Sequence, residues 1–198
     1  MPVDIKWLGH ASFILSAGDT TVAIDPYRVT AGGPVNLVLV THEHYDHCSP
    51  EDVRRLAGPE TVILAPPDCQ GKLEGLGGSF LPVEPGANYE PAGVPVRTVA
   101  AYNLDKPFHP REKGWVGYIV RLGGETVYHT GDSDFVPEME GLGVDVALLP
   151  VGGTYTMDAE EAARAYRAIG ARRAIPMHYG SIVGSEEDAR RFLALIGK

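Results

Sequence analysis

The chain has 198 residues, which at roughly 150 residues per domain predicts one domain covering residues 1–198. Its composition, 44% hydrophobic and 22% charged, is that of a globular protein and excludes a mainly disordered or fibrous chain. With 17 Lys and Arg against 26 Asp and Glu, the net charge is −9, so we expect neither nucleic acid nor an anionic membrane surface as a partner.

The location of the protein follows from segments that the sequence lacks. No apolar stretch approaches the roughly 20 residues of a membrane-spanning helix. The opening residues, MPVDIK, do not resemble the basic and apolar regions of a signal peptide. Two cysteines, Cys48 and Cys69, are too few for a disulfide framework. We therefore expect a cytoplasmic protein with two free thiols.

Short apolar and β-branched runs, separated by Gly, Pro and Asp, predict a strand-rich chain. The expected strands cover residues 3–7, 11–15, 21–24, 37–40, 61–65, 80–83, 94–100, 115–122, 125–129, 144–149 and 174–177. Capping signals predict helices that begin at Ser49, Asp158 and Ser185. The first is expected to end near residue 58 and the second to run to residue 170, and the third has an apolar side at residues 192, 193 and 196. The stretches 71–78 and 84–95 are expected to be loops or hairpin turns. Because runs such as 37–40 and 146–149 are apolar without alternation, these strands are expected to be covered on both faces, which indicates a layered α/β architecture.

The segment THEHYDH at residues 41–47 lies directly after a buried strand and before a helix cap. Imidazole and carboxylate groups are the ligands that borderline divalent metals favour. His42 and His44 are two residues apart and can face the same side of an extended segment, whereas Asp46 and His47 come from the following turn and are better placed to bind a second ion. The segment therefore predicts two metal ions rather than one.

The order of strand followed by ligand recurs at VYHTGD, residues 127–132, and at IPMHYG, residues 175–180. Gly131 allows the sharp turn that would direct Asp132 inward, and His178 ends its own strand in the same way. Considered alone, Asp132 would be a turn or capping residue. Its place in this series favours a metal ligand, with three strands delivering side chains to one edge.

The signature His-Xaa-His-Xaa-Asp-His, complete here at residues 42–47, resembles that of the metallo-β-lactamase superfamily. The segment WLGHASF at 7–13, followed by IDP at 24–26, is similar to the branch of small metal-dependent hydrolases around L-ascorbate-6-phosphate lactonase. The resemblance covers residues 7 to 178. It implies an α/β (α+β) fold, a four-layer αββα sandwich with a dinuclear centre at one edge.

The resemblance also implies a ligand for each ion. The first ion would be held by His42 and His44, the second by Asp46, His47 and His178, and both by a bridging Asp132. One position departs from the family pattern, because the strand that covers residues 94–101 usually ends in a further histidine ligand, and here AYN ends in Asn103. Either the first ion has one protein ligand fewer, or His109 supplies it, or that site is weak and partly occupied.

Three further residues are candidates for the surroundings of the metals. His10 is expected to contact substrate or to donate to a ligand, and His129 to have a structural or supporting role, because strand alternation does not direct it toward the metals. Lys106 belongs to the segment 103–113, which carries three positive charges. This segment either binds an anionic group of the substrate or is an ordinary solvated loop.

These residues predict an enzyme that uses a metal-bound hydroxide to hydrolyse a small, anionic ester or lactone. Asp46 and Asp132 are the candidate catalytic residues, which would orient the water or pass its proton to the leaving group. The expected cofactors are two divalent ions, with zinc first and manganese, iron or nickel as alternatives. The other functions considered are a phosphodiesterase at the same site, a di-iron redox protein and a metal-binding protein without catalysis. Self-association into a homo-oligomer is compatible with the sequence.

Overall fold

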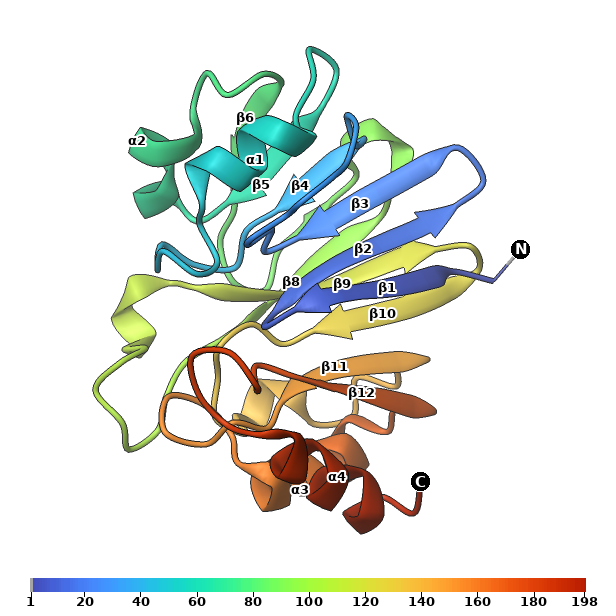
Figure 1. Cartoon of the computed structure of the whole chain (residues 1–198), viewed down its shortest axis with the longest axis vertical. Helices are drawn as coiled ribbons and strands as arrows, with labels where there is room; N and C mark the ends of the chain where they lie inside the picture. The colour runs from blue at the N-terminus through green and yellow to red at the C-terminus, as the bar shows by residue number, and fades with distance from the viewer. Residues whose placement is uncertain (1) are drawn as a thin grey trace.

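The computed structural model describes residues 2–198, which form two six-stranded sheets and four helices. The first sheet contains, in spatial order, β1 (Asp4–Gly9), β2 (Ser12–Ala17), β3 (Thr20–Ile24), β4 (Leu37–Leu39), β5 (Val62–Ala65) and β6 (Ser79–Pro82). Its first three strands pair antiparallel, and the strands from β3 to β6 pair parallel. Helices α1 (Pro50–Leu56) and α2 (Gln70–Leu73) lie on its outer side (Figure 1).

The second sheet has the spatial order β12-β11-β10-β9-β8-β7. Its strands are β7 (Asn88–Tyr89), β8 (Val96–Ala100), β9 (Val116–Leu122), β10 (Glu125–His129), β11 (Val146–Pro150) and β12 (Arg173–Met177). Strands β7 to β10 pair antiparallel, and β10, β11 and β12 pair parallel. Helices α3 (Ala159–Ile169) and α4 (Glu186–Leu195) contact β11 and β12 on the outer side (Figure 1).

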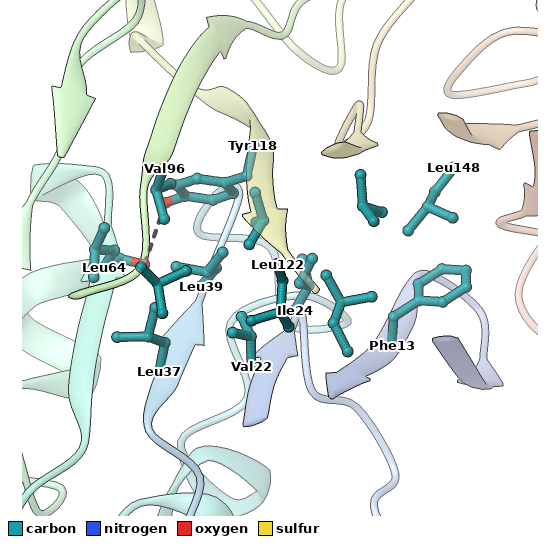
Figure 2. Packing of buried hydrophobic residues seen from close by; sticks show 14 of the residues in the cluster. Phe13, Val22, Ile24, Leu37, Leu39, Leu64, Val96, Tyr118, Leu122 and Leu148 are labelled. Carbon is teal, nitrogen blue, oxygen red and sulfur yellow. Dashed lines mark hydrogen bonds between the residues drawn. The ribbon is translucent and has the colours of Figure 1, made fainter. Parts of the chain in front are cut away.

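Three clusters of buried apolar side chains hold these layers together. One lies between the two sheets, where Phe13 and Leu39 of the first sheet pack with Tyr118 and Leu148 of the second (Figure 2). The buried Tyr118 hydroxyl donates to the Val40 carbonyl at 2.9 Å, so its polar end is satisfied within the core. The other two clusters lie under α1 and α2 and under α3 and α4. Three interfaces between four layers confirm the predicted αββα sandwich.

All eleven predicted strands are present, with bounds shifted by at most two residues. The predicted caps also form. Asp158 accepts a hydrogen bond from the Glu161 amide at 2.8 Å, and Ser185 and Asp188 form a capping box. The loop predictions for 71–78 and 84–95 are wrong in part, because α2 and β7 fall within or beside them. Both elements are too short for a periodic signal, and they form through tertiary contacts. Leu73 of α2 is buried in the cluster between the helices and the first sheet, and β7 pairs with β8.

Both cysteines are buried free thiols, as predicted. Among the helices of residues 2–198, none is long and apolar enough to cross a membrane.

Candidate metal centre

The predicted ligands meet at one edge of the sandwich, in loops that follow strand ends. The parallel strands β3 and β4 and the parallel strands β10 to β12 place their carboxyl ends there. The contributing positions are His10 after β1, residues 42–47 after β4, His109 after β8, Asp132 after β10 and His178 after β12. Both sheets therefore contribute to the cluster.

Asp132 lies at the centre of this cluster, only 4% exposed. Its Oδ2 is 3.0 Å from His178 Nε2, 3.4 Å from His109 Nε2 and 3.9 Å from His42 Nε2. Its Oδ1 is 3.3 Å from His47 Nε2. The two oxygens of one carboxylate thus face four imidazoles.

The turn before Asp132 requires glycine, as the sequence indicated. Gly131 has a φ of 65°, in the left-handed region, and a Cβ at this position would lie 3.0 Å from the Val116 carbonyl oxygen and 3.1 Å from Thr41 Cβ. A side chain here would therefore push Asp132 away from the histidines or displace β9.

The potential ligand atoms fall into two main groups. The first contains His42, His44 and His109, and the second contains His10, Asp46, His47 and His178, with all ligand atoms of a group within 4.8 Å of one another. His42 and His47 also group with Asp132, which connects the two. The structure therefore brings all six predicted metal ligands together, and it adds His109 to the first group and His10 to the second. Of the three alternatives at that position, this geometry favours ligation by His109.

Asn103 determines how His109 is presented. The Asn103 Oδ1 accepts hydrogen bonds from the His109 backbone amide and from Nδ1, both at 3.0 Å. Its Nδ2 donates to Asp134 and to the Tyr155 carbonyl. Because those two partners are acceptors only, the amide orientation is fixed, and His109 Nδ1 carries the proton. His109 Nε2 is then free to bind a cation on the side that faces Asp132.

Asp25 supports both groups from behind. Its Oδ2 lies 2.7 Å from His47 Nδ1 and accepts a hydrogen bond from the Thr41 hydroxyl at 2.7 Å. The same hydroxyl oxygen lies 2.9 Å from His42 Nδ1. Because a carboxylate can only accept, His47 Nδ1 carries a proton that it donates to Asp25. The Thr41 hydroxyl gives its own hydrogen to Asp25, so its oxygen accepts from His42 Nδ1, which therefore also carries a proton. The Nε2 atoms of both histidines face the centre. Asp25 is fully buried, with a left-handed φ of 44°.

Sequence reasoning assigned no role to Asp25, although its position after β3 repeats the pattern of strand followed by ligand. It also missed Trp115, whose buried ring lies 5.0 Å from the ring of His42 and 4.9 Å from that of His44. Nothing in the local sequence around Trp115 indicates this contact, because β8 and β9 must pair before the indole reaches the histidines.

A metal fits this arrangement because the buried polar atoms have no other partners. In the described part of the chain, the buried side-chain polar atoms that lack a hydrogen-bond partner lie at this centre, apart from the Tyr128 hydroxyl. They are His10 Nδ1, His47 Nε2, His109 Nε2, Asp132 Oδ1 and both ring nitrogens of His178. Leaving such groups unpaired costs about 1–3 kcal/mol each. Bound divalent cations would satisfy several of them at once.

The pKa values reflect the same clustering. Burial holds the pKa of His42 well below its usual value, and His47 lowers it further. Burial would raise the pKa of Asp132, but the His178 and His47 imidazoles outweigh it and hold this pKa well below its usual value. Burial would lower the pKa of His47, yet Asp132 and Asp25 raise it well above normal. A cation bound here would take the place of the His47 proton.

His10 lies within this centre, and His129 lies behind it. The His10 Nε2 is 2.8 Å from Asp46 Oδ2, and its carbonyl accepts from the His178 amide at 2.9 Å. His129 Nε2 donates to the Ala11 carbonyl at 2.8 Å, and its Nδ1 accepts from the Gly131 amide at 3.1 Å. Both nitrogens of His129 are therefore engaged with backbone, which leaves none for a metal.

The positive charges of segment 103–113 are paired. Lys106 forms an ion pair with the buried Asp134, Arg111 with Glu138 at 2.9 Å, and Lys113 with Glu43 at 2.9 Å. A charge that already has a carboxylate partner attracts an anionic ligand less strongly, so the structure provides no support from Lys106 for anion binding.

A cavity of about 260 Å³ opens onto the centre. It is lined by His44, Tyr45, Asp46, Phe108, His109, Asp132, Tyr155, His178 and Ile182. A larger hollow of about 650 Å³ lies over the outer face of β8, β9 and β10, and none of the histidines lines it. The smaller cavity is therefore the candidate substrate site, because it alone of the two contains potential metal ligands.

Comparison with known proteins finds relatives that are similar over nearly the whole chain. A family profile described as "Beta-lactamase superfamily domain" matches residues 4–178. The chain is 35% identical over 97% of its length to a UPF0173 metal-dependent hydrolase of Nitratidesulfovibrio vulgaris, and the match covers 86% of that protein. A UPF0173 metal-dependent hydrolase of Thermoplasma acidophilum is 34% identical, with 98% of this chain and 90% of that protein covered. The crystal structure of a protein described as a metal-dependent hydrolase from Parabacteroides distasonis has a TM-score of 0.86 and 29% identity, and covers 99% of this chain and 89% of its own.

Proposed function

We propose that this chain cleaves a small ester or lactone at a centre of two divalent cations. The chain belongs to the metallo-β-lactamase superfamily and is a metal-dependent hydrolase. The observation that carries the proposal is the convergence of unpartnered buried nitrogens and one carboxylate oxygen at the base of the cavity. A purely structural metal would be enclosed by protein ligands, whereas this cluster opens onto a space large enough for a small molecule.

In the proposed centre, each ion has its own ligands and the two share one. His42, His44 and His109 would hold the first ion. Asp46, His47 and His178 would hold the second, and Asp132 would bridge them. Imidazole and carboxylate ligands without thiolates favour zinc, and they also suit manganese, iron and nickel. Zinc is therefore the first metal to test.

When bound, the two cations would lower the pKa of a coordinated water and polarise the scissile carbonyl group. Asp46 lines the cavity, and it is held at its Oδ2 by His10 at 2.8 Å. Burial would raise the Asp46 pKa, but the hydrogen bond with His10 and the neighbouring His47 imidazole bring it far below its usual value. A carboxylate with such a low pKa is a weak base, so the role that suits Asp46 is to accept a hydrogen bond and orient the attacking water.

The test compares metal content with turnover in matched variants. Protein stripped with chelator and reloaded with zinc is assayed on a panel of lactones and p-nitrophenyl esters, with metal per chain measured by elemental analysis. We expect His44→Ala and Asp132→Ala to lose metal and turnover together while remaining folded. Asp105→Ala is the control, because the Asp105 side chain is 86% exposed and lies outside the cavity lining.

Full turnover in Asp132→Ala with metal absent would remove the proposed mechanism. Turnover of bis(p-nitrophenyl) phosphate in place of the ester panel would reassign the reaction to phosphodiester hydrolysis at the same centre.

A further inference from the structure

The open side of the cavity is bounded by apolar side chains from four separate loops. Tyr45 precedes α1, Phe108 lies between β8 and β9, Tyr155 precedes α3, and Ile182 precedes α4. The rings of Phe108 and Tyr155 meet edge to face, with centroids 4.7 Å apart. We call these four residues the apolar rim.

The apolar rim is unusual on this surface. Among residues 2–198, five large hydrophobic side chains are exposed, and three of them belong to the rim: Tyr45 at 65%, Phe108 at 40% and Ile182 at 37%. Single exposed hydrophobic residues are common, but several gathered around one cavity mark a binding surface. They line the same cavity as the potential metal ligands, so a molecule bound in this cavity lies against them.

The same cavity offers no positive side chain to an anionic substrate. Its lining contains neither lysine nor arginine. The cations of the neighbouring loops are paired with carboxylates, as described for Lys106, Arg111 and Lys113, and Lys72 lies 3.6 Å from Glu43. The Arg28 guanidinium lies over the Tyr27 ring and donates to Ser181 at 3.3 Å, and it also falls outside the lining.

We infer that the substrate carries a small, uncharged apolar group next to the scissile bond, and that this group packs against the apolar rim. The inference rests on the proposed hydrolysis and names its substrate class: neutral acyl esters or alkyl-substituted lactones rather than phosphorylated or carboxylated ones. A cavity of about 260 Å³ is slightly smaller than those of drug-sized ligands, about 300–1,000 Å³, so the group is a short chain or a single ring.

Binding of hydroxamic acids tests this assignment without relying on turnover. A hydroxamate chelates zinc, and its tail then reaches the rim. Acetohydroxamic acid has a minimal tail, hexanohydroxamic acid an apolar tail and succinic monohydroxamic acid a charged tail. Each buried methylene strengthens binding by about fourfold. Because the cavity is open on one side, we expect the hexanoyl compound to bind zinc-loaded protein about tenfold more tightly than the acetyl compound. The succinyl compound is expected to bind no more tightly than the acetyl one.

Matched variants locate the effect. Phe108→Ala and Ile182→Ala remove partly exposed rim side chains without opening the core, and each is expected to reduce the hexanoyl preference about threefold to fivefold, leaving acetyl binding unchanged. Leu104→Ala is the control, since Leu104 is 61% exposed on the same loop as Phe108 but does not line the cavity. It should leave the preference intact.

Two measurements separate the proposed hydrolysis from the proposed apolar substrate group. Binding of the three hydroxamates is measured by calorimetric titration, and hydrolysis is measured with p-nitrophenyl acetate, hexanoate and monosuccinate. Equal or tighter binding of the succinyl compound, or a hexanoyl preference that survives both rim variants, would overturn the apolar assignment and leave hydrolysis standing. A rim-dependent hexanoyl preference with no ester turnover would support the apolar assignment and count against the proposed reaction.

Discussion

Replacing Asn103 by alanine should weaken the first metal site and spare the second. Asn103 is 7% exposed, and its side chain hydrogen-bonds to His109, Asp134 and Tyr155 and to none of the ligands of the second site. Its Oδ1 holds His109 at two points, the backbone amide and Nδ1, each at 3.0 Å. In Asn103→Ala these two donors lose their acceptor, and the ring of His109 is free to rotate away from Asp132.

The magnitude follows from these two hydrogen bonds. Removing the partner that orients a ligating histidine typically lowers metal affinity 10–100-fold, which corresponds to about 1.4–2.7 kcal/mol. Two buried donors without an acceptor cost about 1–3 kcal/mol each, so we expect the free energy of unfolding to fall by about 2–6 kcal/mol. The variant should remain folded within the stability range of natural domains, about 5–15 kcal/mol.

The assay is a competition between the protein and a chromophoric zinc chelator, which resolves two dissociation constants when two ions bind. For Asn103→Ala we expect one constant to rise 10–100-fold and the other to stay unchanged. Asn88→Ala serves as the control, because Asn88 is an exposed amide on the edge strand β7, remote from the histidines. Two zinc ions bound by Asn103→Ala with wild-type constants would refute the assignment of His109 to the first site.

Three further predictions concern the support from Asp25, the removal of metal and the ionisation of Asp145. Asp25→Asn should raise the dissociation constants of both ions by about 10–100-fold in the same competition, and a change confined to one ion would contradict the role of Asp25 behind both groups. Removing the metals with a chelator should lower the melting temperature, and zinc at about 100 times its dissociation constant should restore about 2.7 kcal/mol of stability; a melting temperature insensitive to chelator would argue against a bound cation. Hydrogen bonds from the Thr126 amide and hydroxyl hold the pKa of Asp145 below its usual value. This contact therefore stabilises the fold above the unfolded pKa of about 3.9, and the stabilisation is lost as pH falls through the lower folded pKa. The difference in urea midpoint between wild type and Thr126→Val should shrink over that acidic window, and a difference that stays constant with pH would be inconsistent with this linkage.

The strands, the main helices and the first ligands could be predicted because their signals are local. A run such as Leu37–Leu39 is buried on both faces and remains apolar throughout. The caps at Asp158 and Ser185 lie within three residues of the amides they bind. His42 and His44 follow directly from the end of a buried strand. In each case the residues that form the contact are neighbours in sequence, so the pattern carries the geometry.

His109, in contrast, could be named from the sequence only as one of three alternatives for the first site. It reaches the first group because the chain leaves β8 and turns back toward Asn103. The backbone N–H of Asn103 donates to the His109 carbonyl at 2.8 Å. Lys106 lies within this turn, and its partner Asp134 comes from a loop 28 residues further along. Counting the charges of segment 103–113 therefore left anion binding and a solvated loop as alternatives, because the neutralising carboxylates come from other parts of the chain.

The two supporting residues differ in a way that bears on how the centre is built. Asn103 contacts one ligand, His109, whereas Asp25 contacts His47 directly and His42 through Thr41. The two proposed ions therefore share more than the bridging Asp132, because one buried carboxylate orients a histidine from each group. A perturbation at Asp25 must propagate to both ions, and one at Asn103 can be confined to the first. The centre thus has a common support on the first sheet and a separate support for the first ion on the loop after β8. It follows that the first ion should be the more easily lost of the two.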